Sequence, residues 1–263
     1  MTRLDLSKSP ILQPQAPEDL CRIGSQFDGG YVVSKHAISE SKHLLSFGIS
    51  YDVNFEYDFV NFDIHSRLAY MYDASTKPFS PKLTFSVVMN CLRFSSHRPM
   101  KHYLTFLKKR KRLLSSGSAF FKVNISDTED DKCITLTKAL FEIIEKQERN
   151  IFLKVDIEGD EILLLSEIIS NVEYLSGIII EFHRASAIWE LIISFIISLR
   201  DKGLLLDHLH INNYGGLSPS NLPNVIELSF SRSSRNRKAR QRLPIASLDA
   251  PNSPLRMDYD VNF

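Results

Sequence analysis

Short apolar runs alternate with longer amphipathic stretches along most of the chain, and this alternation is typical of an α/β fold. The runs are rich in β-branched and aromatic residues and nearly continuous, as expected for parallel strands covered on both faces. Seven strands are predicted: Leu44–Phe47, Leu68–Tyr72, Phe120–Ile125, Ile151–Asp156, Gly177–Phe182, Leu204–His210 and Val225–Ser231.

Helices are predicted over Gly159–Val172 and Ala185–Lys202. No helix fits between the last two strands, because Asn212–Pro223 is rich in Asn, Gly, Ser and Pro and is typical of a loop. The pattern therefore predicts a mainly parallel seven-stranded sheet whose last strand is antiparallel.

Two basic segments interrupt the alternation. Pro81–Ser118 contains the run Lys108–Arg112, and Ser231–Arg242 reads SRSSRNRKARQR. Neither has enough apolar residues for a core of its own, so both are expected to be surface insertions, the second an exposed loop. The predicted organisation is an N-terminal segment, residues 1–43, packed on an α/β domain, residues 44–263, with an insertion at 81–118.

Composition narrows the class of protein. The 263 residues carry 32 Lys+Arg and 31 Asp+Glu, so no overall charge attracts nucleic acid or an acidic membrane. The three cysteines are scattered, which disfavours a disulfide framework or a thiolate zinc site. The N-terminus has no apolar signal-peptide core, and no apolar window is long enough for a membrane span. A cytoplasmic location is the expectation.

The ends of the first two strands carry a glycine and an acidic residue. Gly48 follows the first strand and Asp73 ends the second. A glycine lets the backbone approach a ligand, and a carboxylate about 20 residues later in such units accepts hydrogen bonds from ribose hydroxyls. A turn glycine and a capping aspartate are the structural alternatives. The nicotinamide motif GxGxxG is absent, which argues against a dehydrogenase.

The segment KVDIEGDE, Lys154–Glu161, is the strongest chemical signal. It places Asp156 at the end of an apolar strand, where α/β sheets bind ligands. A carboxylate there needs a partner.

This segment resembles a motif of the FkbM-type S-adenosylmethionine-dependent methyltransferases. Further matching segments are SFGIS (Ser46–Ser50), the strand-end Asp73, IIIEFH (Ile178–His183), RIGSQFDGGYVV (Arg22–Val33), HINN (His210–Asn213), LPNVIELSF (Leu222–Phe230) and LDAPN (Leu248–Asn252). The resemblance covers roughly residues 20–263. It implies a Rossmann-like class I methyltransferase fold with S-adenosylmethionine as cofactor.

The resemblance also implies roles for single residues. The Gly48 loop would bind the methionine portion, with Asp52 or Glu56 at its amino group. Asp73 would hold the ribose, and Asp156 would face the methyl-transfer centre. The glycine-poor loop after Gly48 departs from the family pattern and leaves these contacts open. The triplet Asp28-Gly29-Gly30 is either a hairpin turn or part of the site.

Histidines near the strand ends supply the remaining candidates. His183 and His210 are predicted to lie beside Asp156 and to serve as general base for an acceptor hydroxyl. Packing at strand ends is the alternative. A divalent metal held by Asp156, Glu181 and a histidine is a further possibility that no sequence motif supports.

The expected reaction is O-methylation of a hydroxyl on a sugar, a glycan or another small acceptor, and the acceptor class comes from the family resemblance alone. The basic runs raise nucleic-acid methylation as an alternative, although solvated surface charge is their commoner explanation. A non-catalytic module that binds the same cofactor is the third hypothesis. The sequence does not determine the oligomeric state.

Overall fold

The computed structural model describes residues 2–76, 98–144, 151–232 and 236–263 and is built on one central sheet. Its strand order is β12-β13-β11-β10-β5-β6-β7. All neighbours are parallel except β13, which is antiparallel to both β11 and β12. The bounds are β5 His43–Phe47, β6 Leu68–Tyr72, β7 Ala119–Phe121, β10 Ile151–Val155, β11 Leu175–His183, β12 Leu205–Ile211 and β13 Val225–Ser231. The predicted α/β class and sheet are confirmed.

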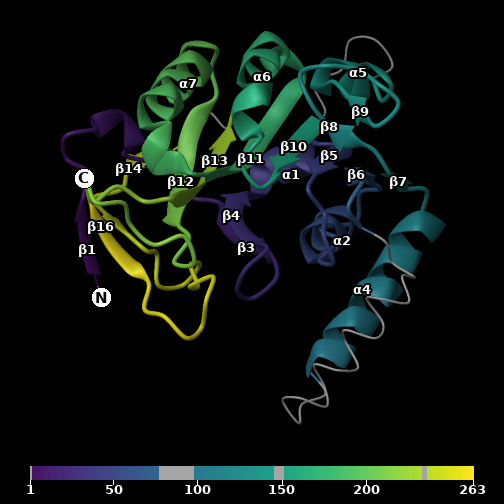
Figure 1. Ribbon diagram of the computed structural model, residues 1–263, viewed down its shortest axis with the longest axis horizontal. Helices are drawn as coiled ribbons and strands as arrows, with labels where there is room; N and C mark the ends of the chain where they lie inside the picture. Colours follow the sequence, from purple (N-terminus) through teal and green to yellow (C-terminus); the bar gives the residue numbers. More distant parts are fainter. Residues whose placement is uncertain (1, 77–97, 145–150, 233–235) are drawn as a thin grey trace.

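Helices cover both faces of the sheet, which is why its strands are largely buried and mostly apolar. One face packs on α5 (Leu136–Phe141), α6 (Leu165–Ser170) and α7 (Trp189–Asp201), which lie together along one side in Figure 1. The other face packs on α1 (Lys35–Glu40), α2 (Asn54–Val60) and α4 (Arg98–Ser115).

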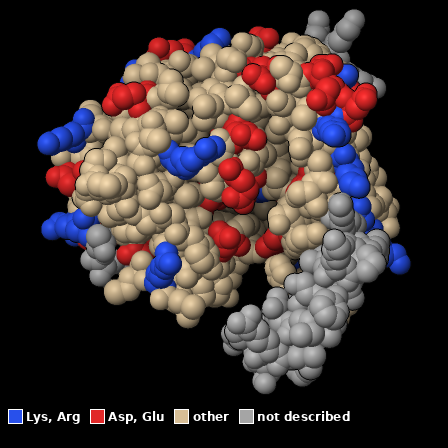
Figure 2. All heavy atoms as spheres, viewed as in Figure 1, with Lys and Arg blue, Asp and Glu red and all other residues tan. Residues whose placement is uncertain are grey.

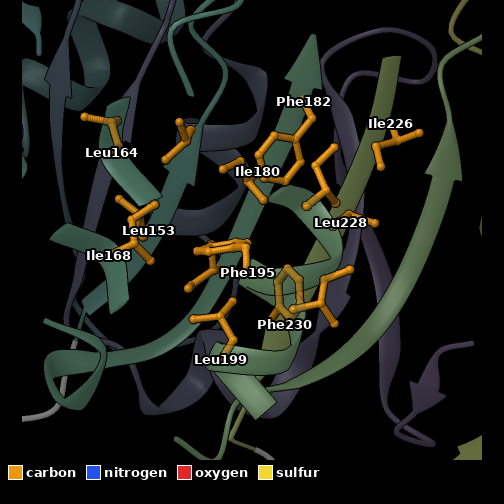
Figure 3. Close-up of a cluster of buried hydrophobic side chains, with 14 of the residues drawn as sticks. Leu153, Leu164, Ile168, Ile180, Phe182, Phe195, Leu199, Ile226, Leu228 and Phe230 are labelled. Carbon is orange, nitrogen blue, oxygen red and sulfur yellow. The ribbon is translucent and has the colours of Figure 1, made fainter. Parts of the chain in front are cut away.

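Alternate residues of β10 point to opposite faces, as the strand period of two requires. Leu153 joins the core under α6 and α7, whereas Phe152 joins the core under α2. Figure 3 shows Leu153 in the first of these cores, where the ring of Phe195 from α7 also meets that of Phe230 from β13. Each side chain buried in this way contributes about 1.5–3 kcal/mol to stability.

The two ends of the chain meet at the same side of the molecule (Figure 1). Strand β1 (Thr2–Asp5) pairs with β16 (Tyr259–Asn262), which also pairs with β15 (Arg242–Leu243). Next along the chain come η1 (Pro10–Leu12), β2 (Gln15–Ala16) and the hairpin of β3 (Leu20–Gly24) and β4 (Gly30–Ser34). This hairpin packs against α2 and the sheet, so residues near the N-terminus reach the sheet's centre.

Three predicted elements are wrong in their extent. The strand predicted over Phe120–Ile125 ends at Phe121, and β8 (Asn124–Ile125) pairs instead with β9 (Cys133–Ile134). The helix predicted over Gly159–Val172 is broken into η2 (Glu161–Leu164), α6 and η3 (Val172–Tyr174). The helix predicted over Ala185–Lys202 begins as η4 (Ala185–Ala187), after which α7 starts at Trp189.

The predicted basic insertions are integrated into the fold where they are described. Residues 81–97 lie outside the described part of the chain, and α4 follows them with Tyr103 and Phe106 buried. The second segment is exposed at Lys238 and Ala239, as predicted, but it is not a loop throughout, because these residues form β14 (Lys238–Ala239), which pairs with β2. Arg237 also forms an ion pair with the buried Asp207, with Nη1 2.6 Å from Oδ1. Among the described helices, none has the length and apolar character that crossing a bilayer requires.

Candidate functional site

A cavity of about 1060 Å³ opens at the carboxyl ends of β5, β6, β10 and β11. It lies where the strand order changes direction between β5 and β10, the place where open α/β sheets bind ligands. Eight acidic side chains line it against one lysine and two histidines among the described residues. Figure 2 shows this acidic character, with Asp and Glu side chains gathered around a central hollow. The cavity therefore favours a positively charged ligand.

Gly48 lines the cavity, but a protein contact explains why it must be glycine. Its φ is +75°, and a Cβ atom built there would lie 1.5 Å from the backbone oxygen of Asp156. The loop after β5 thus crosses directly over the end of β10, which brings Gly48 and Asp156 to one wall of the cavity.

Asp73, predicted to hold a ribose, is engaged by the chain itself. Its Oδ2 accepts hydrogen bonds from the backbone N–H groups of Ile49 and Ser50, and from the Thr76 hydroxyl. Its Oδ1 accepts three more, from the backbone and hydroxyl of Ser75 and the backbone of Thr76. Six donors occupy the carboxylate, so Asp73 fixes the conformation of the loop after Gly48.

Glu56 and Asp52, the two candidates for an amino group, both line the cavity. Glu56 is fully buried on α2, and its Oε1 accepts a hydrogen bond from Ser46 at 2.7 Å. Its Oε2 is buried without a hydrogen-bond partner among the described residues. Lys154 Nζ lies 3.6 Å from Oε1 and donates to the Gly48 carbonyl at 3.0 Å. Burial raises the pKa of Glu56, although the Lys154 charge opposes this.

Asp156 lines the cavity and is held from behind by Tyr31 of the N-terminal hairpin. The Tyr31 hydroxyl lies 3.0 Å from Asp156 Oδ2 and 3.1 Å from Glu181 Oε2. Asn212 Nδ2 donates to the other oxygen of Glu181 at 2.8 Å. Burial raises the pKa of Asp156, and burial together with the Asp156 charge raises that of Glu181 well above its ordinary value.

His183 at the end of β11 also lines the cavity, as predicted. Its Nδ1 lies 2.9 Å from Oε1 of the fully buried Glu161, and its Nε2 lies 3.4 Å from Glu158 Oε2. Burial disfavours charge on the ring, but the Glu161 hydrogen bond and charge outweigh it and raise the pKa of His183. Glu161 also accepts the Gly159 N–H, which explains why KVDIEGDE does not begin a regular helix.

His210 does not belong to this group. Its two ring nitrogens lie 3.2 Å from Glu227 Oε2 and 3.1 Å from Asp258 Oδ2, and the residue is buried outside the cavity lining. His208 is likewise buried, 3.1 Å from Asp249. The prediction that His210 lies beside Asp156 is therefore wrong, because these histidines hold the closing segment of the chain onto the sheet.

Sequence reasoning missed two tyrosines. Tyr31 follows the DGG triplet, whose Asp28 and Gly29 line the cavity, and strand alternation from that turn could have indicated it. Tyr72 precedes Asp73, lines the cavity, and has a buried hydroxyl without a partner among the described residues. Its ring stacks on Phe121 with centroids 4.5 Å apart. Tyr72 and Glu56 thus both line the cavity and each have a buried polar atom without a partner among the described residues.

Together the sheet order and the acidic cavity define an α/β protein with a candidate ligand-binding site. Neither a protein-family model nor a curated protein matches the chain. Several solved structures of similar fold are described as methyltransferases. One is a methyltransferase FkbM from Methylobacillus flagellatus KT, at 14% identity over 72% of this chain and 44% of that chain, with a TM-score of 0.40. An FkbM protein is thus among the similar structures, as the sequence resemblance predicts.

Two further structures are similar at the same level. The precorrin-6y C5,15-methyltransferase from Geobacter metallireducens GS-15 has 10% identity over 74% of this chain and 86% of that chain, with a TM-score of 0.35. The plantazolicin methyltransferase BamL, in complex with a desmethyl-plantazolicin analogue and S-adenosylhomocysteine, has 9% identity over 75% of this chain and 81% of that chain, with a TM-score of 0.35. The present chain spans less than half the length of the FkbM structure. At these identities the similarity concerns the fold alone.

Proposed function

We propose that this protein is an S-adenosylmethionine-dependent methyltransferase that methylates a hydroxyl group of a sugar, a glycan or another small acceptor. One observation carries the proposal: the acidic cavity contains Glu56, whose buried Oε2 lacks a partner among the described residues. A buried carboxylate oxygen needs a donor, and an ammonium group supplies one with a compensating charge.

The residues present fit the cofactor. S-adenosylmethionine, when bound, supplies a methyl group on a positively charged sulfur together with an ammonium group. Glu56 and Asp52 would hold the ammonium, and the wider set of carboxylates would favour the sulfonium charge. The unpartnered Tyr72 hydroxyl would bind the nucleoside in place of the engaged Asp73.

Asp156, Glu158 and His183 lie together in the cavity, and the acceptor hydroxyl would lose its proton among them. Glu161 holds the His183 ring by Nδ1 and so directs Nε2 towards Glu158 and the cavity. Methyl transfer requires little more than alignment of oxygen, methyl and sulfur, which a walled cavity provides.

The acceptor class follows from the resemblance to the FkbM-type family. The basic segments give nucleic acid little support, because several of their cations are engaged within the chain. Arg232 donates to the Leu175, Val172 and Lys202 carbonyls, and Lys109 Nζ lies 3.7 Å from Asp58.

We also propose that residues 1–43 complete the catalytic domain, residues 44–263 with the insertion 81–118, by supplying Tyr31.

Calorimetry with S-adenosylmethionine and S-adenosylhomocysteine tests the proposal. The wild type should bind both, and Glu56→Gln should weaken binding at least about tenfold, or 1.4 kcal/mol, because it removes the charge paired with the ammonium. Glu190→Gln, at an exposed position in the first turn of α7, is the control and should bind like the wild type. Absence of binding to either compound would refute the proposal.

Transfer of a labelled methyl group to a panel of sugars and glycans then tests the acceptor class. Binding without turnover on any hydroxyl acceptor would instead favour the non-catalytic module.

A further inference from the structure

Three side chains in the cavity bring ligand atoms together. One atom each from Asp156, Glu158 and His183 lie within 4.8 Å of one another. Asp156 follows β10 and His183 ends β11, two adjacent parallel strands, so their positions are set by the sheet. Glu158 joins them because it adopts a left-handed backbone conformation, φ +58°, in the turn after β10.

Buried partners hold two of these ligands from behind. Glu161 accepts a hydrogen bond from His183 Nδ1, so in the neutral ring Nδ1 carries the proton and Nε2 has its lone pair on the Glu158 side. Tyr31 occupies Oδ2 of Asp156 and leaves Oδ1 for another partner. A carboxylate behind the imidazole is the outer arrangement that metal-binding histidines commonly have.

Behind the three ligands, Asp156 and Glu181 share the single hydroxyl of Tyr31. The Tyr31 hydroxyl has one proton, yet it lies within 3.1 Å of two carboxylates, Asp156 and Glu181. It donates to one of them, and the raised pKa of Glu181 favours a proton on the second carboxylate. Lys154 directs its ammonium to Gly48 and Glu56 instead. Carboxylates held this close together need a shared proton or added positive charge.

We infer that Asp156, Glu158 and His183 bind a divalent cation of the Mn²⁺ or Mg²⁺ type in this cavity. Two carboxylates and one imidazole suit Mn²⁺, and three protein ligands leave coordination positions for water or a substrate oxygen. The site differs from the sequence prediction of Asp156, Glu181 and a histidine, because Asn212 and Tyr31 occupy both oxygens of Glu181.

Cation binding goes beyond the proposed function and does not require it. Where that function holds, the cation would lower the pKa of the acceptor hydroxyl, and the proton would pass to water at the site instead of to a side chain that coordinates the cation. The hydroxyl oxygen then forms its bond to the methyl carbon, while the carbon–sulfur bond breaks and its electron pair stays on sulfur.

The test is a titration of the full-length, EDTA-treated chain with MnCl₂, followed by electron paramagnetic resonance of free Mn²⁺. The wild type should bind one Mn²⁺ per chain saturably. His183→Ala and Asp156→Asn should each weaken binding at least about tenfold, and Glu161→Gln about 10- to 100-fold through the ring it orients. The control Asp160→Asn removes a neighbouring cavity carboxylate outside the three ligands and should bind normally.

Circular dichroism of each variant checks that it folds. Glu158→Gln changes an exposed side chain and therefore tests the site without disturbing the core. Non-saturable binding, or equal losses in Asp160→Asn and His183→Ala, would overturn the inference. Calorimetry with S-adenosylhomocysteine in EDTA separates the two proposals. Cofactor binding without Mn²⁺ binding refutes only the cation site, whereas Mn²⁺ binding without cofactor binding refutes only the methyltransferase.

Discussion

The hydroxyl of Tyr31 lies 3.0 Å from Oδ2 of Asp156, although 125 positions separate the two residues in the chain. The first belongs to the N-terminal hairpin and the second to the end of the central strand β10. The cavity is therefore completed by a segment that precedes the first strand of the sheet. A chain lacking the hairpin would leave the partly buried Asp156 and the buried Glu181 without their shared donor.

Tyr31→Phe isolates this contact, because it keeps the ring that meets Phe55 edge-on and removes only the hydroxyl. We expect the free energy of unfolding to fall by about 1–3 kcal/mol, the cost of leaving a buried acceptor unsatisfied. Urea denaturation measures it. Tyr259→Phe, at a partly exposed position, is the control and should change stability by less than about 0.5 kcal/mol. Equal effects of the two substitutions would contradict a special role for the Tyr31 hydroxyl.

Gly48→Ala tests the crossing of the loop over β10. The added methyl carbon would lie 1.5 Å from the Asp156 backbone oxygen, so the loop or the strand must move. We expect a loss of more than about 4 kcal/mol, which few single substitutions reach. Thermal unfolding followed by circular dichroism measures the change.

Gly216→Ala is the matched control, since Gly216 also has a positive φ but no atom within 4 Å of the added Cβ. It should cost only about 1–2 kcal/mol of backbone strain. A Gly48→Ala protein as stable as Gly216→Ala would show that the close approach is absent.

The sheet could be predicted because its strands are buried on both faces and therefore appear as continuous apolar runs. β6 and β13 have the predicted bounds, and β5 and β10 differ by one residue at one end. The helix after β10 could not be predicted in the same way, because Glu161 looks like a favourable first-turn charge. Its carboxylate is instead committed to His183 and to backbone N–H groups of the turn.

The candidate site could likewise be predicted only in part. Residues at strand ends, such as Asp156 and His183, were found because parallel strands place their carboxyl ends at one edge. Strand alternation alone does not show that His183 lies in the cavity and His210 outside it. The position of His210 depends on the closing segment of the chain, which supplies Asp258. The position of Tyr31 at the site depends on how a hairpin distant in the sequence packs on the sheet, and the local sequence pattern does not encode that packing.

Asp73→Asn distinguishes a loop-fixing role from a ribose contact. The asparagine retains one acceptor oxygen, so several of the six hydrogen bonds to Asp73 are lost, at about 1.5–3 kcal/mol each for a charged acceptor. We expect a lower free energy of unfolding in the absence of any ligand, measured by urea denaturation. Unchanged stability with weaker S-adenosylhomocysteine binding would show that the carboxylate contacts the cofactor instead.

The pH dependence of that loss has a defined direction. Burial alone would raise the pKa of Asp73, but hydrogen bonds from Ser75, Ser50 and Thr76 outweigh it and hold the pKa below 3.8. The stabilisation is therefore complete above pH 3.8 and is lost as the pH falls through the lower folded-state value. The difference between wild type and Asp73→Asn should shrink in acid.

For His210 we expect the opposite pH dependence, with stability lost in alkaline solution. Burial disfavours its charge, but the Glu227 charge and the Asp258 hydrogen bond outweigh burial and raise the pKa well above 6.5. Its stabilisation is complete below pH 6.5 and is lost as the pH rises through the raised folded-state value. His210→Gln leaves two buried carboxylates without their cation, so we expect a loss of about 3–5 kcal/mol near pH 6 that diminishes towards pH 10.

Urea denaturation across this pH range measures the effect, with His36→Gln as the matched control. His36 is exposed and lies 3.2 Å from Glu40, an exposed pair worth less than about 1 kcal/mol. If the loss in His210→Gln were the same at pH 6 and pH 10, the ring would be neutral throughout. His210 would then join the closing segment to the sheet through hydrogen bonds without charge, and the carboxylates beside it would need another source of positive charge.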